Sequence, residues 1–174
     1  MTPCSHNFRN LTCLVIRVCM AISLLGITPN LQAQSTKPLN IGDTIPDLVV
    51  ADMIKPLAGA LTTKSLYSDG MLIISFWATC CRPCVREIEF LAKEVDGYQG
   101  KLNVIYVSDE SKTVVQDFLD KHPSIVASAL VVTGADTVFK KMFFHQSLPH
   151  NVWIDQEGCI KAITGTGEVT SFKH

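Results

Sequence analysis

Apolar runs and segments with helical spacing alternate along the chain. Met71–Ala78 is apolar except for Ser75, and Leu102–Ser108 (LNVIYVS) is a second run of similar character. Runs of this length with so few polar positions are typical of strands that are buried on both faces of a sheet. Four shorter segments are further strand candidates: Leu48–Ala51, Ala127–Val132, His150–Asp155 and Cys159–Thr164.

Helical periodicity lies between these strands. Val85, Ile88 and Leu91 recur at helical spacing after the first run, and they predict a helix that ends by Gly97 or Gly100. Alternating strands and helices predict an α/β fold with a mostly parallel sheet, in which the last two strands form an antiparallel hairpin at the edge. The other helical candidates are a turn near Thr63–Tyr67, an amphipathic helix over Ser111–Lys121 with Ser111 as its N-cap, and a helix over Asp136–Phe144.

The segment that follows the last predicted strand is short. Residues 165–174, GTGEVTSFKH, are too few to form a well-packed closing helix. A mostly parallel sheet needs cover on both faces. We therefore expect the C-terminal closing helix to be absent or truncated, so that further chain or a partner surface covers that face.

Met1–Ala33 has the pattern of a secretory leader. Arg9 and Arg17 supply positive charge, Val18–Ile27 is an apolar core, and Ala33 ends a cleavage site. An uncleaved membrane anchor is the alternative, but Arg17 within the apolar stretch weighs against it. The predicted organisation is a signal peptide over residues 1–33, a linker over 34–40 and a single domain over 41–174.

Charge and cysteine content narrow the range of possible functions. Lys and Arg number 15 against 16 Asp and Glu, so no excess of positive charge suggests a nucleic-acid partner. Of the seven cysteines, three lie in the leader, and those that remain are Cys80, Cys81, Cys84 and Cys159. Bridges among the first three would close only very short loops and would stabilise the fold little. Their crowding therefore favours chemistry over scaffolding.

The Cys81–Cys84 segment (CRPC) lies where the first long strand turns into a helix. A cysteine at a helix N-terminus meets unpaired backbone N–H groups and the positive end of the helix dipole, which favour its thiolate. The second cysteine lies one turn later, within reach of a disulfide with the first. Pro83 is tolerated because first-turn N–H groups have no helical partner. This pattern predicts a redox-active dithiol.

The residues around the dithiol resemble a known family. Phe76-Trp77-Ala78-Thr79-x-Cys81-x-Pro83-Cys84 is similar to the active-site signature of thioredoxin-like proteins, in particular the exported thiol-disulfide oxidoreductases of the ResA/TlpA type. The similarity extends in order from Ile41 to Thr164. It implies a thioredoxin-like three-layer fold, with a central mixed sheet and helices on both faces.

The resemblance also implies roles for individual residues. Cys81 matches the nucleophile that attacks a substrate disulfide, and Cys84 matches the thiol that resolves the mixed disulfide. Pro149 matches a cis-proline that faces the cysteine pair. Glu87 matches an acidic residue that relays a proton to or from the second cysteine, since three residues along a helix place it on the same side. The substrate-docking residues implied are Trp77, Arg82, Leu148 and Pro149.

Two positions depart from the family pattern. Ser75 stands where cytosolic thioredoxins carry a buried acid, which makes Glu87 the substitute. Cys80 stands where an aromatic residue usually precedes the first cysteine. We expect Cys80 to be a small buried side chain, and Cys159 to be a packing residue, because free cysteine packs as a hydrophobe. Arg82 should help to hold a thiolate on Cys81.

The predicted function is that of a disulfide reductase in the periplasm or cell envelope of a Gram-negative bacterium. It needs neither a cofactor nor a metal, and its partners are protein disulfide substrates and an upstream envelope electron donor. No nucleic acid is involved, and contact with a membrane is limited to an N-terminal anchor, if the leader stays uncleaved.

Three alternatives remain open at this point. Cys80 and Cys84 have the spacing of Cu(I)-binding thioredoxin-fold modules, with His145 or His150 as a third ligand. Peroxidase chemistry at Cys81 is a second alternative, although Thr79 lacks the preceding proline of that family. An inert interaction module is the third.

Overall fold

The computed structural model describes residues 37–50, 53–54, 61–126, 130–133 and 137–167. All of these belong to one compact unit, Thr36–His174. The predicted leader, residues 34–36 of the predicted linker and residues 168–174 lie outside the described residues. No helix in the described part of the chain is long and apolar enough to cross a membrane.

A five-stranded mixed sheet forms the centre of the domain, with strand order β3-β2-β1-β4-β5. β1, β2 and β3 are parallel, whereas β4 runs antiparallel to β1 and pairs with β5 as a hairpin. The strands are β1 Met71–Trp77, β2 Leu102–Ser108, β3 Leu130–Thr133, β4 His150–Ile154 and β5 Ile160–Thr164. The predicted parallel sheet with an antiparallel edge is confirmed.

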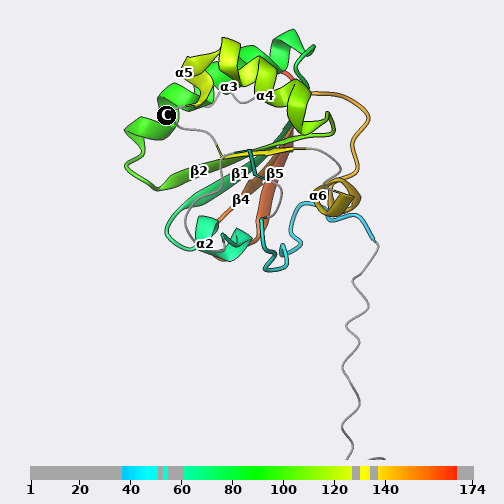
Figure 1. Cartoon of the computed structure of the whole chain (residues 1–174). Coiled ribbons are helices and arrows are strands. Elements are labelled where there is room, and N and C mark those ends of the chain that lie inside the picture. Colours follow the sequence, from blue (N-terminus) through cyan, green and yellow to red (C-terminus); the bar gives the residue numbers. More distant parts are fainter. Residues whose placement is uncertain (1–36, 51–52, 55–60, 127–129, 134–136, 168–174) are drawn as a thin grey trace, which may run out of the picture. The chain divides into compact units, whose positions relative to one another are not determined.

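Helices lie on both faces of the sheet (Figure 1). α3 (Arg82–Gly97), α4 (Lys112–Lys121) and α5 (Pro123–Val126) cover one face, and α2 (Thr63–Tyr67) and α6 (Thr137–Met142) lie on the other. α2 has the predicted bounds, and Ser111 caps α4 as predicted, since its hydroxyl accepts a hydrogen bond from Val114 N at 3.5 Å. α5 follows directly and was not predicted.

β1 is buried on both faces because its side chains alternate between two hydrophobic clusters. Leu72, Ile74 and Phe76 pack with α2 and α6, whereas Ile73 and Trp77 pack with α3, α4 and α5. Alternation of this kind follows from the two-residue period of a strand. The continuous apolar run therefore indicates a central strand that is buried on both faces, as predicted.

The predicted strand Leu48–Ala51 is wrong for the residues described there. Only a single bridge joins Val49 to Thr62. Thr63 limits the pairing, because its backbone N–H donates to Leu48 O at 2.8 Å while its hydroxyl accepts from Leu48 N at 2.9 Å. A side-chain acceptor thus takes the place of the next ladder partner, and the ladder does not extend past Leu48 toward Pro46.

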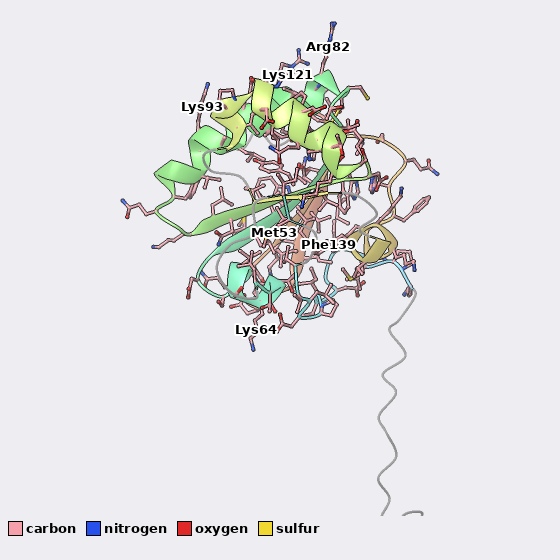
Figure 2. All side chains as sticks on the ribbon, viewed as in Figure 1. Met53, Lys64, Arg82, Lys93, Lys121 and Phe139 are labelled. Carbon is pink, nitrogen blue, oxygen red and sulfur yellow. A yellow bond between two sulfur atoms is a disulfide. The ribbon has the colours of Figure 1, made fainter. Side chains whose placement is uncertain are left out.

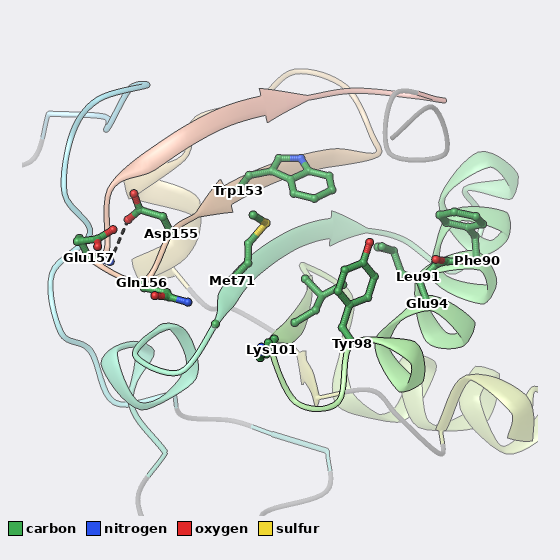
Figure 3. A pocket seen from close by; sticks show the side chains of 12 residues that line it. Met71, Phe90, Leu91, Glu94, Tyr98, Lys101, Trp153, Asp155, Gln156 and Glu157 are labelled. Carbon is green, nitrogen blue, oxygen red and sulfur yellow. Dashed lines mark hydrogen bonds between the residues drawn. The ribbon is translucent and has the colours of Figure 1, made fainter. Parts of the chain in front are cut away.

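One part of the α3 face carries a pocket of about 490 Å³ beside β4 (Figure 3). Phe90 of α3 and Tyr98, the residue just after α3, line it on one side and Trp153 of β4 on the other, with Met71 between them. The described residues contain no helix after β5. The sequence predicted missing cover without saying which face of the sheet would lack it, and the pocket lies on the face that carries α3.

Candidate redox site

β1 leads directly into α3, and the turn between them carries the cysteines. Cys81 N donates to Ala78 O at 3.0 Å, which closes a turn over residues 78–81. Cys81 is the N-cap of α3, and its Sγ accepts a hydrogen bond from Cys84 N at 3.3 Å. Pro83 occupies the first turn, where a missing N–H has no cost. The helix N-terminus thus donates to the sulfur, as the sequence predicted.

Cys81 and Cys84 form a disulfide, with Cα atoms 5.3 Å apart. The two sulfurs differ in access. Cys81 is partly exposed, whereas Cys84 is 1% exposed and belongs to the cluster under α3. A partner protein can therefore reach Cys81 but not Cys84.

Arg82 projects into solvent at the start of α3 (Figure 2). Its cation lies one residue from Cys81, in the region that any partner of that sulfur must approach. Cationic neighbours favour a thiolate.

The Leu148–Pro149 peptide bond is cis, in the form that the resemblance predicts. Pro149 precedes β4, whose first residue His150 pairs with Phe76 near the end of β1. Strand pairing therefore brings Pro149 to the edge of the sheet at which β1 turns into the cysteine segment. Pro149 itself is buried, and Leu148 is partly buried against the cluster that contains Cys84.

Glu87 lies in the interior, not on a solvated helix face. It is 4% exposed, and its Oε1 accepts a hydrogen bond from Asn151 Nδ2 at 2.9 Å. Below it, Tyr106, Ser75 and Asn151 form a polar row across β2, β1 and β4, because Ser75 pairs with both of the others. All three are at most 2% exposed. A carboxylate in such a place is costly unless it is hydrogen-bonded, and Asn151 meets that need.

The pKa of Tyr106 depends on its burial and on the charge of the Glu87 carboxylate. Burial, and next the negative charge of Glu87, raise the pKa of Tyr106 well above its ordinary value. The phenol therefore stays protonated next to Glu87. Its hydroxyl has no hydrogen-bond partner among the described residues.

Two residues near the dithiol differ from expectation. Cys80 was predicted to be buried, but it is exposed and free, because it lies at the tip of the turn over residues 78–81. Trp77 was predicted as a docking residue, but it is 2% exposed and packs against Phe118 with ring centroids 5.4 Å apart. Burial leaves Trp77 no surface to offer a partner, and we assign it to the core.

Cys159 is free and partly buried on the hairpin. Its Sγ lies 3.8 Å from Gly42 O. It is far from the dithiol along the hairpin and takes no part in the site.

Glu110 was missed by sequence reasoning. Its carboxylate accepts hydrogen bonds from Thr79 N and Thr79 Oγ1, each at 2.7 Å, and from Ser108 Oγ at 3.2 Å. The Glu110 N–H donates to the same Ser108 hydroxyl at 3.2 Å. We call these four hydrogen bonds the Glu110 clamp. The sequence signal was an acidic residue just after the buried strand β2, whose end lies beside the end of parallel β1.

His145 and His150 stack near the cis bond. Their rings are 5.0 Å apart at 17°, and both contact Phe76. Burial, and then the nearby His145, lower the pKa of His150 to about 4. His150 is therefore neutral at pH 7.

The ligands of the Cu(I) alternative are not gathered in the structure. Cys84 is buried in the disulfide, whereas Cys80 is exposed at the turn. The described residues contain no group of three or more His, Cys, Asp or Glu side chains placed to hold a metal ion.

A mixed sheet with a dithiol at the N-terminus of the helix after the central strand, beside a cis-proline, defines a thioredoxin-like protein. A solved thiol:disulfide interchange protein of the thioredoxin family from Chlorobium tepidum TLS shares the fold, with a TM-score of 0.61 at 15% identity over 77% of this chain and 93% of that one.

The chain belongs to the AhpC/TSA family, which it matches over residues 41–163. It is 28% identical over 161 residues to the thiol-disulfide oxidoreductase ResA of Geobacillus kaustophilus, covering 88% of each chain. It is also 28% identical over 152 residues to the thioredoxin-like protein YneN of Bacillus subtilis, covering 83% of this chain and 85% of that protein. Oxidoreductase activity at a thiol-disulfide centre follows from these relatives.

Proposed function

We propose that this protein is a disulfide reductase of the cell envelope that acts through the dithiol of Cys81 and Cys84. The observation that carries the proposal is the unequal access of the two sulfurs at the N-terminus of α3. A thiolate on Cys81 is favoured by the first-turn N–H groups and can meet a protein disulfide.

Catalysis then takes two exchange steps. The Cys81 thiolate attacks one sulfur of the substrate disulfide, forms a mixed disulfide and releases the other sulfur as a thiolate. Cys84 next attacks Cys81, which restores the intramolecular disulfide and releases the second substrate thiol. Two electrons pass from the dithiol to the substrate, and an upstream envelope donor returns them.

Glu87 is the group that we assign to the proton of Cys84. It is buried one helical turn after Cys84, and its carboxylate is held by Asn151. It accepts the thiol proton as Cys84 becomes a nucleophile and returns it when the dithiol is regenerated. Cys84 is shielded from water, so a nearby buried base is needed for this step.

The docking surface consists of Arg82, Leu148 and the cis peptide bond at Pro149. Arg82 is exposed beside Cys81, and Leu148 is partly exposed at the start of β4. For location, we propose that residues 1–33 export the chain to the periplasm of a Gram-negative cell. The arginines and apolar core of this segment support that proposal.

An insulin reduction assay on the purified protein tests the activity. We expect turnover in the wild type and a loss of nearly all turnover in Cys81→Ser, because the remaining exposed thiol, Cys80, does not cap α3. Cys80 therefore lacks the first-turn hydrogen bond that favours a thiolate. Cys84→Ser should instead accumulate the mixed disulfide, visible as a mass increase under non-reducing conditions. A well-folded wild type without turnover would contradict the proposal.

Redox titration against glutathione tests the direction of electron flow. A two-electron midpoint clearly below that of glutathione is expected for a reductase. A midpoint well above it would make the protein an oxidant.

A further inference from the structure

Three cysteines lie close enough in sequence to form the disulfide of this site, and two of them are bonded in the structure. Cys80, Cys81 and Cys84 lie within five residues. Cys81 and Cys84 are bonded, whereas Cys80 is free and exposed. Any pair among the three closes a short loop, so loop closure alone discriminates weakly.

The competing pair is Cys80 with Cys84. Neighbouring Cα atoms are about 3.8 Å apart, below the usual Cα separation in disulfides, so Cys80 and Cys81 are poorly placed to bond each other. Cys80 and Cys84 have no such restriction. A Cys80–Cys84 bond would require the turn over residues 78–81 to reorient, so that the Cys80 side chain takes the place that the Cys81 side chain holds here.

The Glu110 clamp acts on this turn. Thr79 is the residue directly before Cys80, and both its N–H and its hydroxyl are held by the Glu110 carboxylate at 2.7 Å. Ser108, at the end of β2, is 1% exposed and bonds the carboxylate and the Glu110 N–H. Because hydrogen bonds to a charged group are strong, Thr79, the second residue of the turn, is tied to the rigid end of the neighbouring strand.

We propose that Glu110 is a positioning residue that sorts the three thiols, so that Cys81 and not Cys80 faces Cys84. The clamp fixes Thr79, the Cys81–Ala78 hydrogen bond fixes the other end of the turn, and Cys80 is left at the exposed tip. The inference rests on the proposed dithiol chemistry, since sorting matters when the site is oxidised in each cycle.

Formation of the mispaired Cys80–Cys84 disulfide uses the same substrate disulfide as its oxidant. If Cys80 replaces Cys81, the thiols of Cys80 and Cys84 lose two protons and two electrons to the substrate disulfide, which becomes two thiols. The product holds Cys81 as a free thiol, and the helix N-cap loses its bonded sulfur. No additional oxidant is needed.

Differential alkylation locates the free thiol in the oxidised protein. Free thiols are blocked with N-ethylmaleimide, the disulfide is then reduced and labelled with iodoacetamide, and peptide fragmentation assigns each label. Fragmentation is needed because Cys80 and Cys81 are adjacent and stay in the same peptide, and because Pro83 prevents tryptic cleavage after Arg82. In the wild type, N-ethylmaleimide should be found on Cys80, with Cys159 as an internal reference.

Glu110→Ala should move the first label from Cys80 onto Cys81, raising the ratio of mispaired to correctly paired protein roughly tenfold or more. Glu110→Gln should largely restore the wild-type pattern, because its amide keeps an acceptor for Thr79. If Glu110→Ala does not fold, Thr79→Val decides instead, since it removes one clamp hydrogen bond without removing the carboxylate. A folded variant whose label stays on Cys80 would overturn the proposal.

Insulin reduction by the double variant supplies the second readout. Cys80→Ser alone should keep wild-type turnover, and in the Glu110→Ala background it should recover turnover lost through mispairing. A merely structural role for Glu110 predicts no such recovery, and that result would overturn the proposal. If the wild type and Cys80→Ser both lack turnover, the proposed function fails, whereas alkylation still decides the pairing.

Discussion

Single residues decide the chemistry of the buried side of this site. Thioredoxin-like folds can place an acid on the central strand, but here that position holds Ser75 and the acid comes from α3 as Glu87. Asn151 donates to it from β4. A carboxylate that is 4% exposed depends on such a donor, because water cannot replace the hydrogen bond.

Asn151→Leu should therefore destabilise the protein by about 1.5–3 kcal/mol, the contribution of a hydrogen bond to a charged group. In a Glu87→Gln background the same change should cost less, since no charge is left unpaired. A double-mutant cycle by urea unfolding measures this coupling. Equal costs in both backgrounds would show that Asn151 does not support the carboxylate.

His150 makes stability depend on acid pH. Its pKa is lowered to about 4 in the folded protein by burial and by His145, whereas an unfolded histidine titrates near 6.5. Between these values the unfolded chain binds more protons, so the free energy of unfolding should fall as pH drops from 6.5 to 4. One proton gives at most about 1.4 kcal/mol per pH unit, and partial exposure of the ring reduces this.

Urea unfolding at several pH values checks the histidine effect. His150→Gln removes the titrating group and should flatten the dependence between pH 4 and 6.5. The same slope in both proteins would assign the acid sensitivity elsewhere.

At the scale of elements, β1 and β2 are held together by close approach at one end and by the Glu110 clamp at the other. Met71 N donates to Lys101 O at 2.8 Å where the two strands begin. Gly70 lies at this point, and a Cβ there would come within 2.1 Å of the Lys101 carbonyl oxygen. The backbone can approach so closely only because Gly70 has no side chain.

Gly70→Ala should destabilise the domain by about 1–3 kcal/mol or more, as overpacking against backbone does. Gly97→Ala is the matched control, since a Cβ at the end of α3 meets nothing within 4 Å. Thermal unfolding followed by circular dichroism compares the two. Equal midpoints would mean that the β1–β2 junction relaxes without strain.

At the scale of the whole molecule, local sequence patterns predicted the helices and strands. Contacts between residues far apart in sequence determined which side chains meet at the site. The apolar run of β1, the cap at Ser111 and the dithiol at the start of α3 are encoded within a few residues. Glu110 and Thr79 are 31 positions apart, and Glu87 and Asn151 are 64 apart, so only the assembled sheet shows that they meet.

The exposure of Cys80 and Trp77, which the sequence predicted wrongly, also depends on residues far away in sequence. Cys80 is exposed because Thr79 donates hydrogen bonds to Glu110, just after β2, and these orient its turn. Trp77 is buried because α4 brings Phe118 onto it. Neither α4 nor β2 is near these residues in sequence. Side-chain exposure at the site is thus a property of the tertiary structure.

The order of the strands also sets when the site can form during synthesis. The central strand β1 needs β4 as a neighbour, and the chain near Gly42 and Ile45 is hydrogen-bonded to Gly158 and Ile160 of the hairpin. The first residues of the domain therefore reach their hydrogen-bond partners only after the hairpin near its C-terminal end has been synthesised. A chain that emerges from its N-terminus exposes all three neighbouring thiols before the proline loop and the acid's amide partner exist. The complete site, with Pro149 and Asn151 beside the dithiol, can consequently form only after the hairpin has been synthesised.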